Sequence, residues 1–328
     1  DRERWDSLCA QLEIPQPPGG TAVTFEEATR ICERIGFPAL VRPSYVLGGR
    51  AMTIVYDLQE LEEAMTELAA FGGLGREGGL SADRPVLIDR FLEDAIEVDV
   101  DSIRDQTGEF VLGGILEHVE EAGVHSGDSA CAIPPPNLSQ ETQEVIVEYA
   151  KQLAERLEVV GLLNVQFAVK QGQVFVIEAN PRASRTVPFV AKATGVQLAK
   201  VAARVMAGET LKELRESGAL PEPIREGHVA VKEAVLPFQR FPDVDTVLGP
   251  EMRSTGEVMG IDKTFGLAFA KSQIAAGEGL PVGGTIFFSL ADRDKDQGLE
   301  AARGFVELGF TLAATSGTAE FLSSNGVH

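Results

Sequence analysis

The sequence has few cations, few cysteines and no long apolar run. Its 328 residues include 29 Lys and Arg against 50 Asp and Glu, a formal net charge of −21. This charge argues against nucleic acid or an anionic membrane as a partner, and an anionic substrate would need local cations. No apolar run approaches the roughly 18 residues of a membrane span, and the first residues differ from a secretion signal. We therefore expect a globular cytoplasmic protein.

The three cysteines, Cys9, Cys32 and Cys131, lie far apart in the sequence and form no CxxC pair. Such spacing is typical of buried reduced thiols and not of disulfides or a zinc site. With 44% hydrophobic residues the chain can bury a large core, and its length favours two or three folding units. Because the sequence does not begin with Met, we expect it to be part of something longer.

Helical and strand-like segments alternate along the chain, which predicts a mixed α/β protein. Strands are expected at residues 37–42, 86–91, 96–103 and 110–119, and helices at residues 24–36, 58–71 and from 139 onward. The glycine-rich residues 72–83 predict a loop. A strand, helix, strand pattern begins again near the end, at 285–290, 297–308 and 311–314, and we interpret residues 281–328 as a separate small domain.

Two apolar runs between Leu162 and Glu178 flank Lys170-Gln171-Gly172, which predicts a β-hairpin with a three-residue loop. With Val169 opposite Gln173, this register puts Gln166 and Glu178 on the same face of the sheet. A two-residue loop would put these two side chains on opposite faces.

A first candidate site is the segment from Arg42 to Arg50, which contains Gly48 and Gly49. Backbone N–H groups of small residues and two guanidinium groups can bind phosphate oxygens, which matters in so acidic a protein. An ordinary glycine turn is an equally good interpretation of these residues.

A second candidate site combines Gln166 with Glu178, Asn180, Arg182 and Arg185. Oxygen ligands at a strand end can hold Mg²⁺, and the arginines could neutralise a small anionic acceptor and a transferred phosphoryl group. A carboxylate paired with an arginine on a solvated rim is the alternative. Five polar residues on an otherwise apolar hairpin make that alternative less attractive, because their burial without a ligand is costly.

A third segment, residues 117–129, holds His118 and His125 among carboxylates, hydroxyls and glycines. It could serve a nucleotide, a metal or proton transfer, but its residue types favour a surface turn with solvated charges. The alternating carboxylates Glu97, Asp99 and Asp101 are interpreted as the polar face of a strand, with Glu97 the best candidate for another role.

Together these motifs resemble the carbamoyl-phosphate-synthesising half of the large subunit of carbamoyl phosphate synthetases, which are ATP-grasp proteins. The resemblance covers most of the chain in order, in residues 41–52, 97–101, 117–132, 164–168, 177–208 and 231–270. It implies the α/β class: an α+β ATP-grasp fold with antiparallel sheets in residues 1–280. Residues 281–328 resemble the start of a methylglyoxal-synthase-like regulatory domain, an incomplete small doubly wound α/β domain with Lys295, Thr315 and Thr318 near an effector phosphate.

The resemblance also implies a role for each candidate residue. ATP contacts are implied for Arg42, Gly48, Gly49, Arg50, Arg90, Leu92, Glu97, Gly123, Val124, His125, Ser126, Gln166 and Glu178. Mg²⁺ or Mn²⁺ is implied at Gln166, Glu178 and Asn180, and a K⁺ site at Glu97, His118, Glu121, Val124 and Ser129. Asn180, Arg182 and Arg185 form the implied catalytic set. Glu121 replaces a common amide and Arg90 a common histidine, which puts the monovalent-ion preference and adenosine affinity in question.

By the same resemblance, the substrate is carbamate and the product carbamoyl phosphate, for pyrimidine and arginine biosynthesis. The implied partners are a glutaminase small subunit and the other half of the large subunit. Two alternatives stay open: another ATP-grasp carboxylate ligase, such as a biotin-carboxylase-like or peptide-forming enzyme, and a nucleotide-binding regulatory fragment without turnover.

Overall fold

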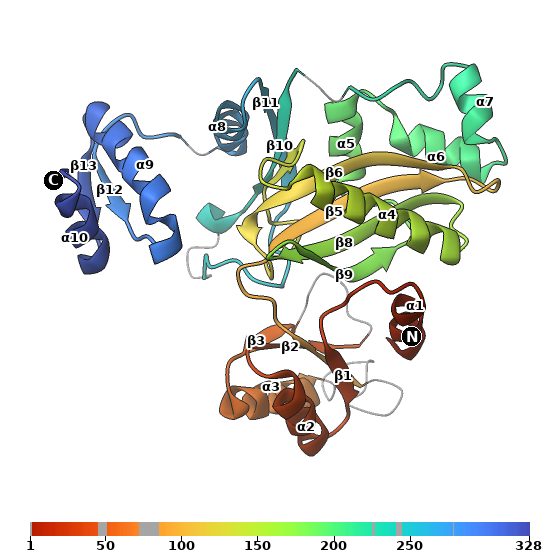
Figure 1. The fold of residues 1–328 in the computed structure, drawn as a ribbon, viewed down its shortest axis with the longest axis horizontal. Coiled ribbons are helices and arrows are strands. Elements are labelled where there is room, and N and C mark those ends of the chain that lie inside the picture. The colour runs from red at the N-terminus through yellow and green to blue at the C-terminus, as the bar shows by residue number, and fades with distance from the viewer. Residues whose placement is uncertain (1, 45–50, 72–84, 225–226, 241–244, 278) are drawn as a thin grey trace. The chain divides into compact units, whose positions relative to one another are not determined.

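The computed structural model describes residues 2–44, 51–71, 85–224, 227–240, 245–277 and 279–328. The chain divides into two compact units, Asp1–Gly277 and Glu278–His328. The first unit contains a four-stranded and a seven-stranded sheet, both antiparallel, and the second a parallel pair of strands (Figure 1). The predicted α/β class with antiparallel sheets is therefore confirmed.

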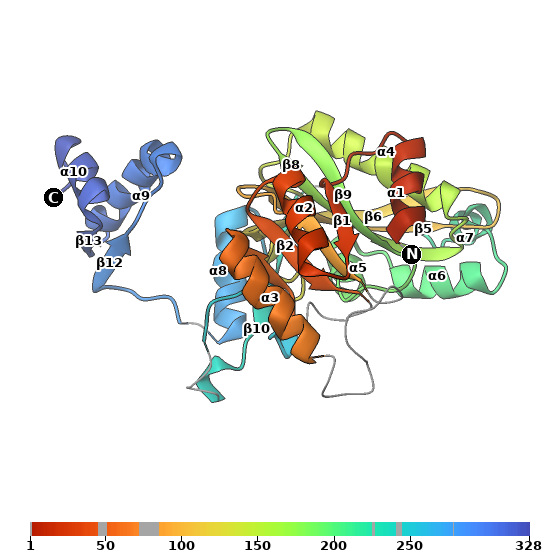
Figure 2. The same ribbon diagram turned by 90° about the horizontal axis from the view of Figure 1, so that it is seen from below.

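The four-stranded sheet forms the smaller part of the first unit. Its strands lie in the order β1 (Gly19–Ala22), β4 (Val86–Arg90), β2 (Ala39–Pro43) and β3 (Thr53–Val55). Helices α2 (Phe25–Ile35) and α3 (Leu58–Phe71) contact each other and pack their apolar faces into the core of this sheet (Figure 2). Thr24 caps α2 by accepting a hydrogen bond from the Glu27 backbone N–H, as the spacing predicts.

The seven-stranded sheet forms the larger part of the first unit. Its order is β11 (Gly256–Asp262), β10 (Val229–Val235), β7 (Cys131–Ile133), β6 (Phe110–Glu121), β5 (Ile96–Arg104), β8 (Gly161–Lys170) and β9 (Gln173–Asn180). Side chains of β5 alternate between two cores: Val98 and Val100 face one, and Ile103 the other. The sheet therefore buries apolar side chains on both faces.

Helices cover both faces of the large sheet. Helix α4 (Gln140–Arg156), capped by Ser139 as predicted, and α1 (Arg2–Gln11) contribute to the Val98 core. Helices α5 (Val187–Thr194), α6 (Leu198–Met206) and α7 (Leu211–Glu216) pack into the Ile103 core. Helix α8 (Phe265–Ala276) contacts β10 and β11.

The second unit repeats the predicted strand, helix, strand pattern. Strand β12 (Thr285–Phe288) pairs in parallel with β13 (Thr311–Ala314). Helix α9 (Lys295–Glu307) connects them, and α10 (Ser316–Ser324) follows. Phe288, Ala302 and Leu322 form its small core.

The predicted register of the β8–β9 hairpin is wrong. Lys170 pairs with Gln173, so the loop has two residues, Gln171 and Gly172, with φ angles of 52° and 80°. Two positive φ angles match the twist of a two-residue hairpin, which explains why this loop forms. The expected shared face nevertheless holds, because a register shift after Gln166 leaves Ile177 unpaired and brings Glu178 opposite Gln166.

Two other expectations concern single residues and loops. All three cysteines are buried and free, which confirms the interpretation as reduced thiols. The predicted loop at residues 72–83 lies outside the described residues. Across the described part of the chain, we find no helix with the length and apolar character that crossing a membrane requires.

The hairpin turn generates a stability prediction. A positive φ costs a residue with a β-carbon roughly 1 kcal/mol, and Asn tolerates it better than Gln. We expect Gln171→Asn to raise the free energy of unfolding by about 0.5–1 kcal/mol in urea denaturation. The matched control is Gln173→Asn, in the strand beside the turn, where Asn is disfavoured. Equal stabilisation by both variants would contradict the assigned turn.

Candidate active site

A cleft of about 520 Å³ opens between the two sheets of the first unit. Its walls come from β2 and β4 of the small sheet, from β5, β8, β9 and β10 of the large sheet, and from residues 122–127. All five residues of the second predicted site line it: Gln166, Glu178, Asn180, Arg182 and Arg185. The polar groups of the hairpin therefore converge on a single cavity.

Three side chains with oxygen atoms, Gln166, Glu178 and Asn180, lie near one another in the paired strands β8 and β9. Glu178 lies opposite Gln166 in the sheet, and Asn180 Nδ2 donates to Glu178 Oε1 at 2.7 Å. That bond leaves the Asn180 carbonyl oxygen free to act as a ligand. Among the described residues, no three His, Cys, Asp or Glu side chains form a cluster that could hold a metal. One carboxylate with amide oxygens suits Mg²⁺, which takes its remaining ligands from water and phosphate.

The loop that carries the two arginines is tied to β5 by a buried carboxylate. Asp101 is 1% exposed and accepts hydrogen bonds from Ser184 Oγ at 2.7 Å and from Thr186 Oγ1. Burial raises the pKa of Asp101 to about 6, against the effect of these hydrogen bonds. Arg182 and Arg185, which flank Ser184, keep exposed side chains. The loop is anchored while its guanidinium groups remain available.

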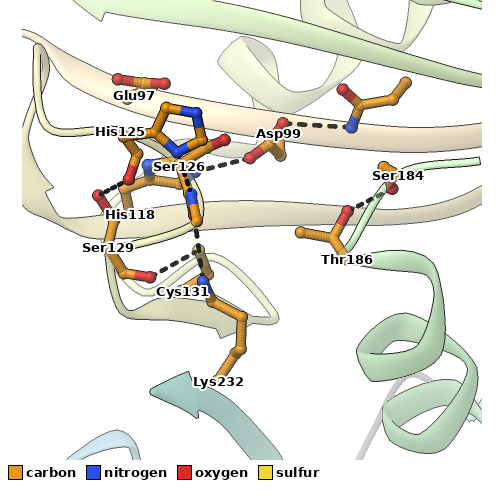
Figure 3. Close-up of polar contacts among 12 residues, drawn as sticks. Glu97, Asp99, His118, His125, Ser126, Ser129, Cys131, Ser184, Thr186 and Lys232 are labelled. Carbon is orange, nitrogen blue, oxygen red and sulfur yellow. Dashed lines mark hydrogen bonds and ion pairs between the residues drawn. The ribbon is translucent and has the colours of Figure 1, made fainter. Parts of the chain in front are cut away.

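Asp99 and Asp101 belong to the polar face of β5, opposite the core residues Val98 and Val100, but this face is buried and not solvated. Asp99 Oδ2 lies 2.9 Å from His118 Nε2 (Figure 3). Asn164 Nδ2 donates to the carboxylates of Asp99 and Asp101, at 3.2 and 3.1 Å. Burial alone would raise the pKa of Asp99, but the hydrogen bond and charge of His118 lower it below its ordinary value. Although burial opposes protonation of His118, the neighbouring Cys131, Asp99 and Glu97 hold its pKa well above the ordinary value.

The third predicted segment is not a solvated surface turn, since Glu117, Asp128 and Ser129 are buried. The Asp128 carboxylate accepts hydrogen bonds from the backbone N–H groups of Arg253 and Ser254, at 2.7 and 2.8 Å. Carboxylates saturated by backbone donors can be buried at low cost, which residue types alone do not reveal. This segment is a fixed wall of the cleft.

The implied nucleotide contacts in this wall lie close to β5. Gly123 N donates to Glu97 Oε2 at 3.5 Å, and the Gly123 φ of 106° requires glycine. Burial raises the pKa of Glu97 to about 7. Burial also lowers the pKa of His125. Val124, His125 and Ser126 line the same cleft.

The small sheet provides the opposite wall. Arg42 Nη2 lies 2.8 Å from Asp89 Oδ2, and Arg2 Nη2 lies 2.7 Å from Asp89 Oδ1, so one carboxylate serves two guanidinium groups. Arg90 donates to the Phe37 carbonyl oxygen, and Leu92 lines the cleft. The predicted phosphate-binding residues Gly48, Gly49 and Arg50 lie outside the described residues.

The set implied for K⁺ spans β5, β6 and the loop after β6. Ser129 Oγ donates to the His125 carbonyl oxygen at 3.4 Å, and Val124 N to the Glu121 carbonyl oxygen at 3.4 Å. Glu97 and Val124 line the cleft, and His118 is buried beside Asp99.

Sequence reasoning missed three cleft residues, Asp99, Asn164 and Lys232, and the buried Asp101 that anchors the arginine loop. Asn164 pairs with Asp101 across β8 and β5, and both alternate with apolar neighbours. The sequence does carry a signal for these residues: polar residues alternate with apolar ones on β5 and again on β8, at Asn164 and Gln166. Polar faces on two paired central strands cannot all be solvated, so this alternation indicates buried polar side chains.

The pKa of Glu97 generates a pH-dependent prediction. Below pH 4.5, the ordinary value, the carboxyl is protonated in both folded and unfolded chains and contributes nothing. Between pH 4.5 and pH 7 the unfolded chain ionises first, so the folded state loses up to about 3 kcal/mol of stability through this group, and the loss is complete above pH 7. Glu97→Gln should therefore raise the free energy of unfolding at about pH 8 and leave it unchanged at about pH 4.

Urea denaturation at both pH values measures this, with Glu93→Gln in the exposed β4–β5 connection as control. The control should change stability little at either pH. A Glu97→Gln gain of the same size at both pH values would contradict the assignment, because better packing of the amide would then be the cause.

Solved structures share this fold at low sequence identity. The biotin carboxylase domain of Hydrogenobacter thermophilus 2-oxoglutarate carboxylase, determined with MgADP and bicarbonate, is 21% identical with a TM-score of 0.60, over 73% of this chain and 51% of that one. N5-carboxyaminoimidazole ribonucleotide synthetase from Thermus thermophilus is 19% identical with a TM-score of 0.61, over 86% and 73%. The fold is thus the ATP-grasp fold.

Sequence comparison gives the family. A family model described as "Carbamoyl-phosphate synthase L chain, ATP binding domain" matches residues 1–214, and one for an MGS-like domain matches residues 297–328. Over its whole length the chain is 57% identical to the carbamoyl phosphate synthase large chain of Archaeoglobus fulgidus, of which it covers 29%. It is 52% identical to a carbamoyl phosphate synthase large chain, C-terminal section, from Aquifex aeolicus, of which it covers 62%. The chain spans less than two thirds of these relatives, and it belongs to the carbamoyl-phosphate synthase large-chain family.

Proposed function

We propose that the first unit transfers the γ-phosphoryl group of ATP to carbamate, which yields carbamoyl phosphate and ADP. One observation carries this proposal: Gln166, Glu178, Asn180 and two exposed arginines line one wall of the inter-sheet cleft. That set combines metal-ligand oxygens with cations in a chain whose net charge is −21. Such an arrangement suits the transfer of a phosphoryl group to a small anion.

We assign the nucleotide to the part of the cleft nearest the small sheet. Leu87, Phe91, Leu92 and Ile177 supply apolar lining there, which suits a purine ring. Glu97 and the segment from Gly123 to Ser126 are assigned to the rest of the nucleoside, and Arg42 and Arg90 to its phosphates. Arg42 can serve in this way because its partner Asp89 is already bonded to Arg2.

Divalent metal is assigned to Gln166, Glu178 and Asn180, with Mg²⁺ or Mn²⁺ as the ion. The donor set fits, because Asn180 and Glu178 bond each other through one amide N–H and leave acceptor oxygens over. When bound, such an ion would neutralise charge on the phosphate oxygens. A K⁺ ion is proposed beside Glu97, His118, Glu121, Val124 and Ser129.

In the proposed step, a carbamate oxygen attacks the γ-phosphorus as the bond from that phosphorus to the β–γ bridging oxygen breaks. ADP leaves with that oxygen, and no covalent enzyme intermediate is needed. Arg182 and Arg185 bind the acceptor carboxylate and the charge that develops on the phosphoryl oxygens. Asp101 holds their loop in place through Ser184 and Thr186.

Within the complete enzyme, we propose that the carbamate comes from the other half of the large subunit, using ammonia from a glutaminase subunit. The product would serve pyrimidine and arginine biosynthesis in the cytoplasm. The second unit is proposed as the start of an effector-binding domain, in which Lys295, Thr315 and Thr318 bind phosphate. Thr315 and Thr318 support this, since their hydroxyl groups lie 3.1 Å apart at the start of α10.

Two other functions make different predictions. A biotin-carboxylase-like or peptide-forming ligase would turn over with biotin or amino acids instead of carbamate. A binding module would take up Mg-ATP in calorimetry without any turnover. A product assay with these acceptors, beside a Mg-ATP titration, separates the three functions.

The metal assignment generates the decisive mutational test. Glu178→Gln keeps the shape of the side chain but removes the only carboxylate of the proposed metal set. In the complete large chain, we expect ATP formation from ADP and carbamoyl phosphate to fall at least about 100-fold. The control is Glu155→Gln on the exposed face of α4, which should retain activity. Unchanged activity of Glu178→Gln would rule out its proposed role.

A further inference from the structure

Lys232 is buried, and its ammonium group makes a single hydrogen bond within the described residues. Lys232 lies in the middle of β10, is 1% exposed and lines the cleft. Its Nζ donates to the Ser126 carbonyl oxygen at 3.1 Å. The next residue, Glu233, points to the other face of the strand and accepts a hydrogen bond from Gln273 of α8 at 2.6 Å.

The charge of Lys232 lacks a close counter-ion in the described part of the chain, where no carboxylate lies within 4.0 Å of its Nζ. Two carboxylates of the neighbourhood have hydrogen-bond donors other than Lys232: Glu120 accepts from the Ala130 N–H at 2.6 Å, and Glu233 accepts from Gln273. An ammonium group has three N–H donors, and burying it unpaired costs several kcal/mol, by order of magnitude. A ligand that supplies the missing negative charge would offset this cost.

The position of Lys232 indicates which part of a ligand it meets. The wall segment from Gly123 to Gly127 runs away from the small sheet: a β-carbon at Gly123 would touch the Phe91 ring, at 2.7 Å. At its other end, a β-carbon on Gly127 would lie 2.8 Å from Arg185 Nη1 and 3.1 Å from His125 Nδ1. Lys232 contacts Ser126, next to that cationic end (Figure 3). Its bond to Ser126 therefore places Lys232 at the end of this segment that lies beside Arg185, and not at the Gly123 end beside Phe91.

We infer that Lys232 binds an oxyanion at the acceptor end of the cleft, donating to it from β10 while Arg182 and Arg185 approach from the loop after β9. The oxyanion is either the acceptor carboxylate or the phosphoryl group that it receives. This inference rests on the proposed function and adds a third cation to that site. Lys232 is in this view a substrate-binding residue.

A purely structural role makes a different prediction. If Lys232 served only to hold Ser126, its loss would loosen the whole segment from Gly123 to Gly127. The affinity for the nucleoside part of the ligand would then fall together with the affinity for the terminal phosphate. An oxyanion contact, by contrast, leaves binding of MgADP unchanged.

The experiment uses the complete large chain with Lys232→Met, Lys232→Arg and the control Lys271→Met. Lys271 is an exposed lysine on α8 that pairs with Asp262. Calorimetry measures affinities for MgADP and for a magnesium complex of a non-hydrolysable ATP analogue. Steady-state assays of ATP formation measure KM for carbamoyl phosphate.

For Lys232→Met, we expect MgADP affinity within about twofold of wild type. Binding of the ATP analogue or KM for carbamoyl phosphate should worsen by about 10-fold to 100-fold. Loss confined to the ATP analogue identifies the phosphoryl group as the ligand, and loss confined to carbamoyl phosphate identifies the acceptor end. Lys232→Arg should recover part of the loss, and Lys271→Met should match wild type.

Two outcomes overturn the inference: an equal loss of MgADP and ATP-analogue affinity, or no loss at all. If Lys232→Met does not fold, Lys232→Arg decides, because its changed donor geometry must alter analogue binding or KM while sparing MgADP. Failure of the wild-type chain to bind MgADP or the analogue would instead contradict the proposed function. The two failures are therefore distinguishable.

Discussion

The cleft depends on one irregularity in strand pairing. Between Gln166 and Phe167 the partner strand β9 contains one residue more than β8, so Ile177 has no partner. Without this bulge, the two-residue turn would place Gln166 and Glu178 on opposite faces of the sheet. Because of it, Phe167 and Val176 pack into the α4 core while Glu178 and Asn180 face the cleft. One extra residue in β9 thus separates the part of the hairpin that packs in the hydrophobic core from the part that lines the cleft.

Hydrogen bonds connect the buried polar side chains at the base of the cleft. Asn164 bridges Asp99 and Asp101, Asp99 bonds His118, and Asp101 holds the arginine loop. Each carboxylate has several donors, which is the condition for burying it in a protein interior. The floor of the cleft is therefore rigid, whereas Arg182 and Arg185 remain exposed above it. Such an arrangement preorganises donors toward a ligand.

Periodicity and capping predicted part of the first unit: helices α2, α3 and α4, and strands β2, β4, β5, β6, β8 and β9. Helix α3 has the predicted bounds, and Ser139 and Thr24 cap the helices expected after them. The hairpin register was not predictable, because a bulge depends on contacts such as that between Val176 N and the Pro15 carbonyl oxygen. The burial of Asp99 and Asp128 was missed for the same reason: their hydrogen-bond partners lie 19 or more residues away.

The shared carboxylate of Asp89 also links two parts of the first unit. Arg2 belongs to α1, which packs into the α4 side of the large sheet, whereas Asp89 belongs to β4 of the small sheet. Widening the cleft by a hinge rotation of the small sheet must either separate these charges or pull α1 from its core. Because the Arg2 and Asp89 side chains are only 15% and 9% exposed, dissolved salt screens this pair weakly, and it opposes such a rotation even at high ionic strength.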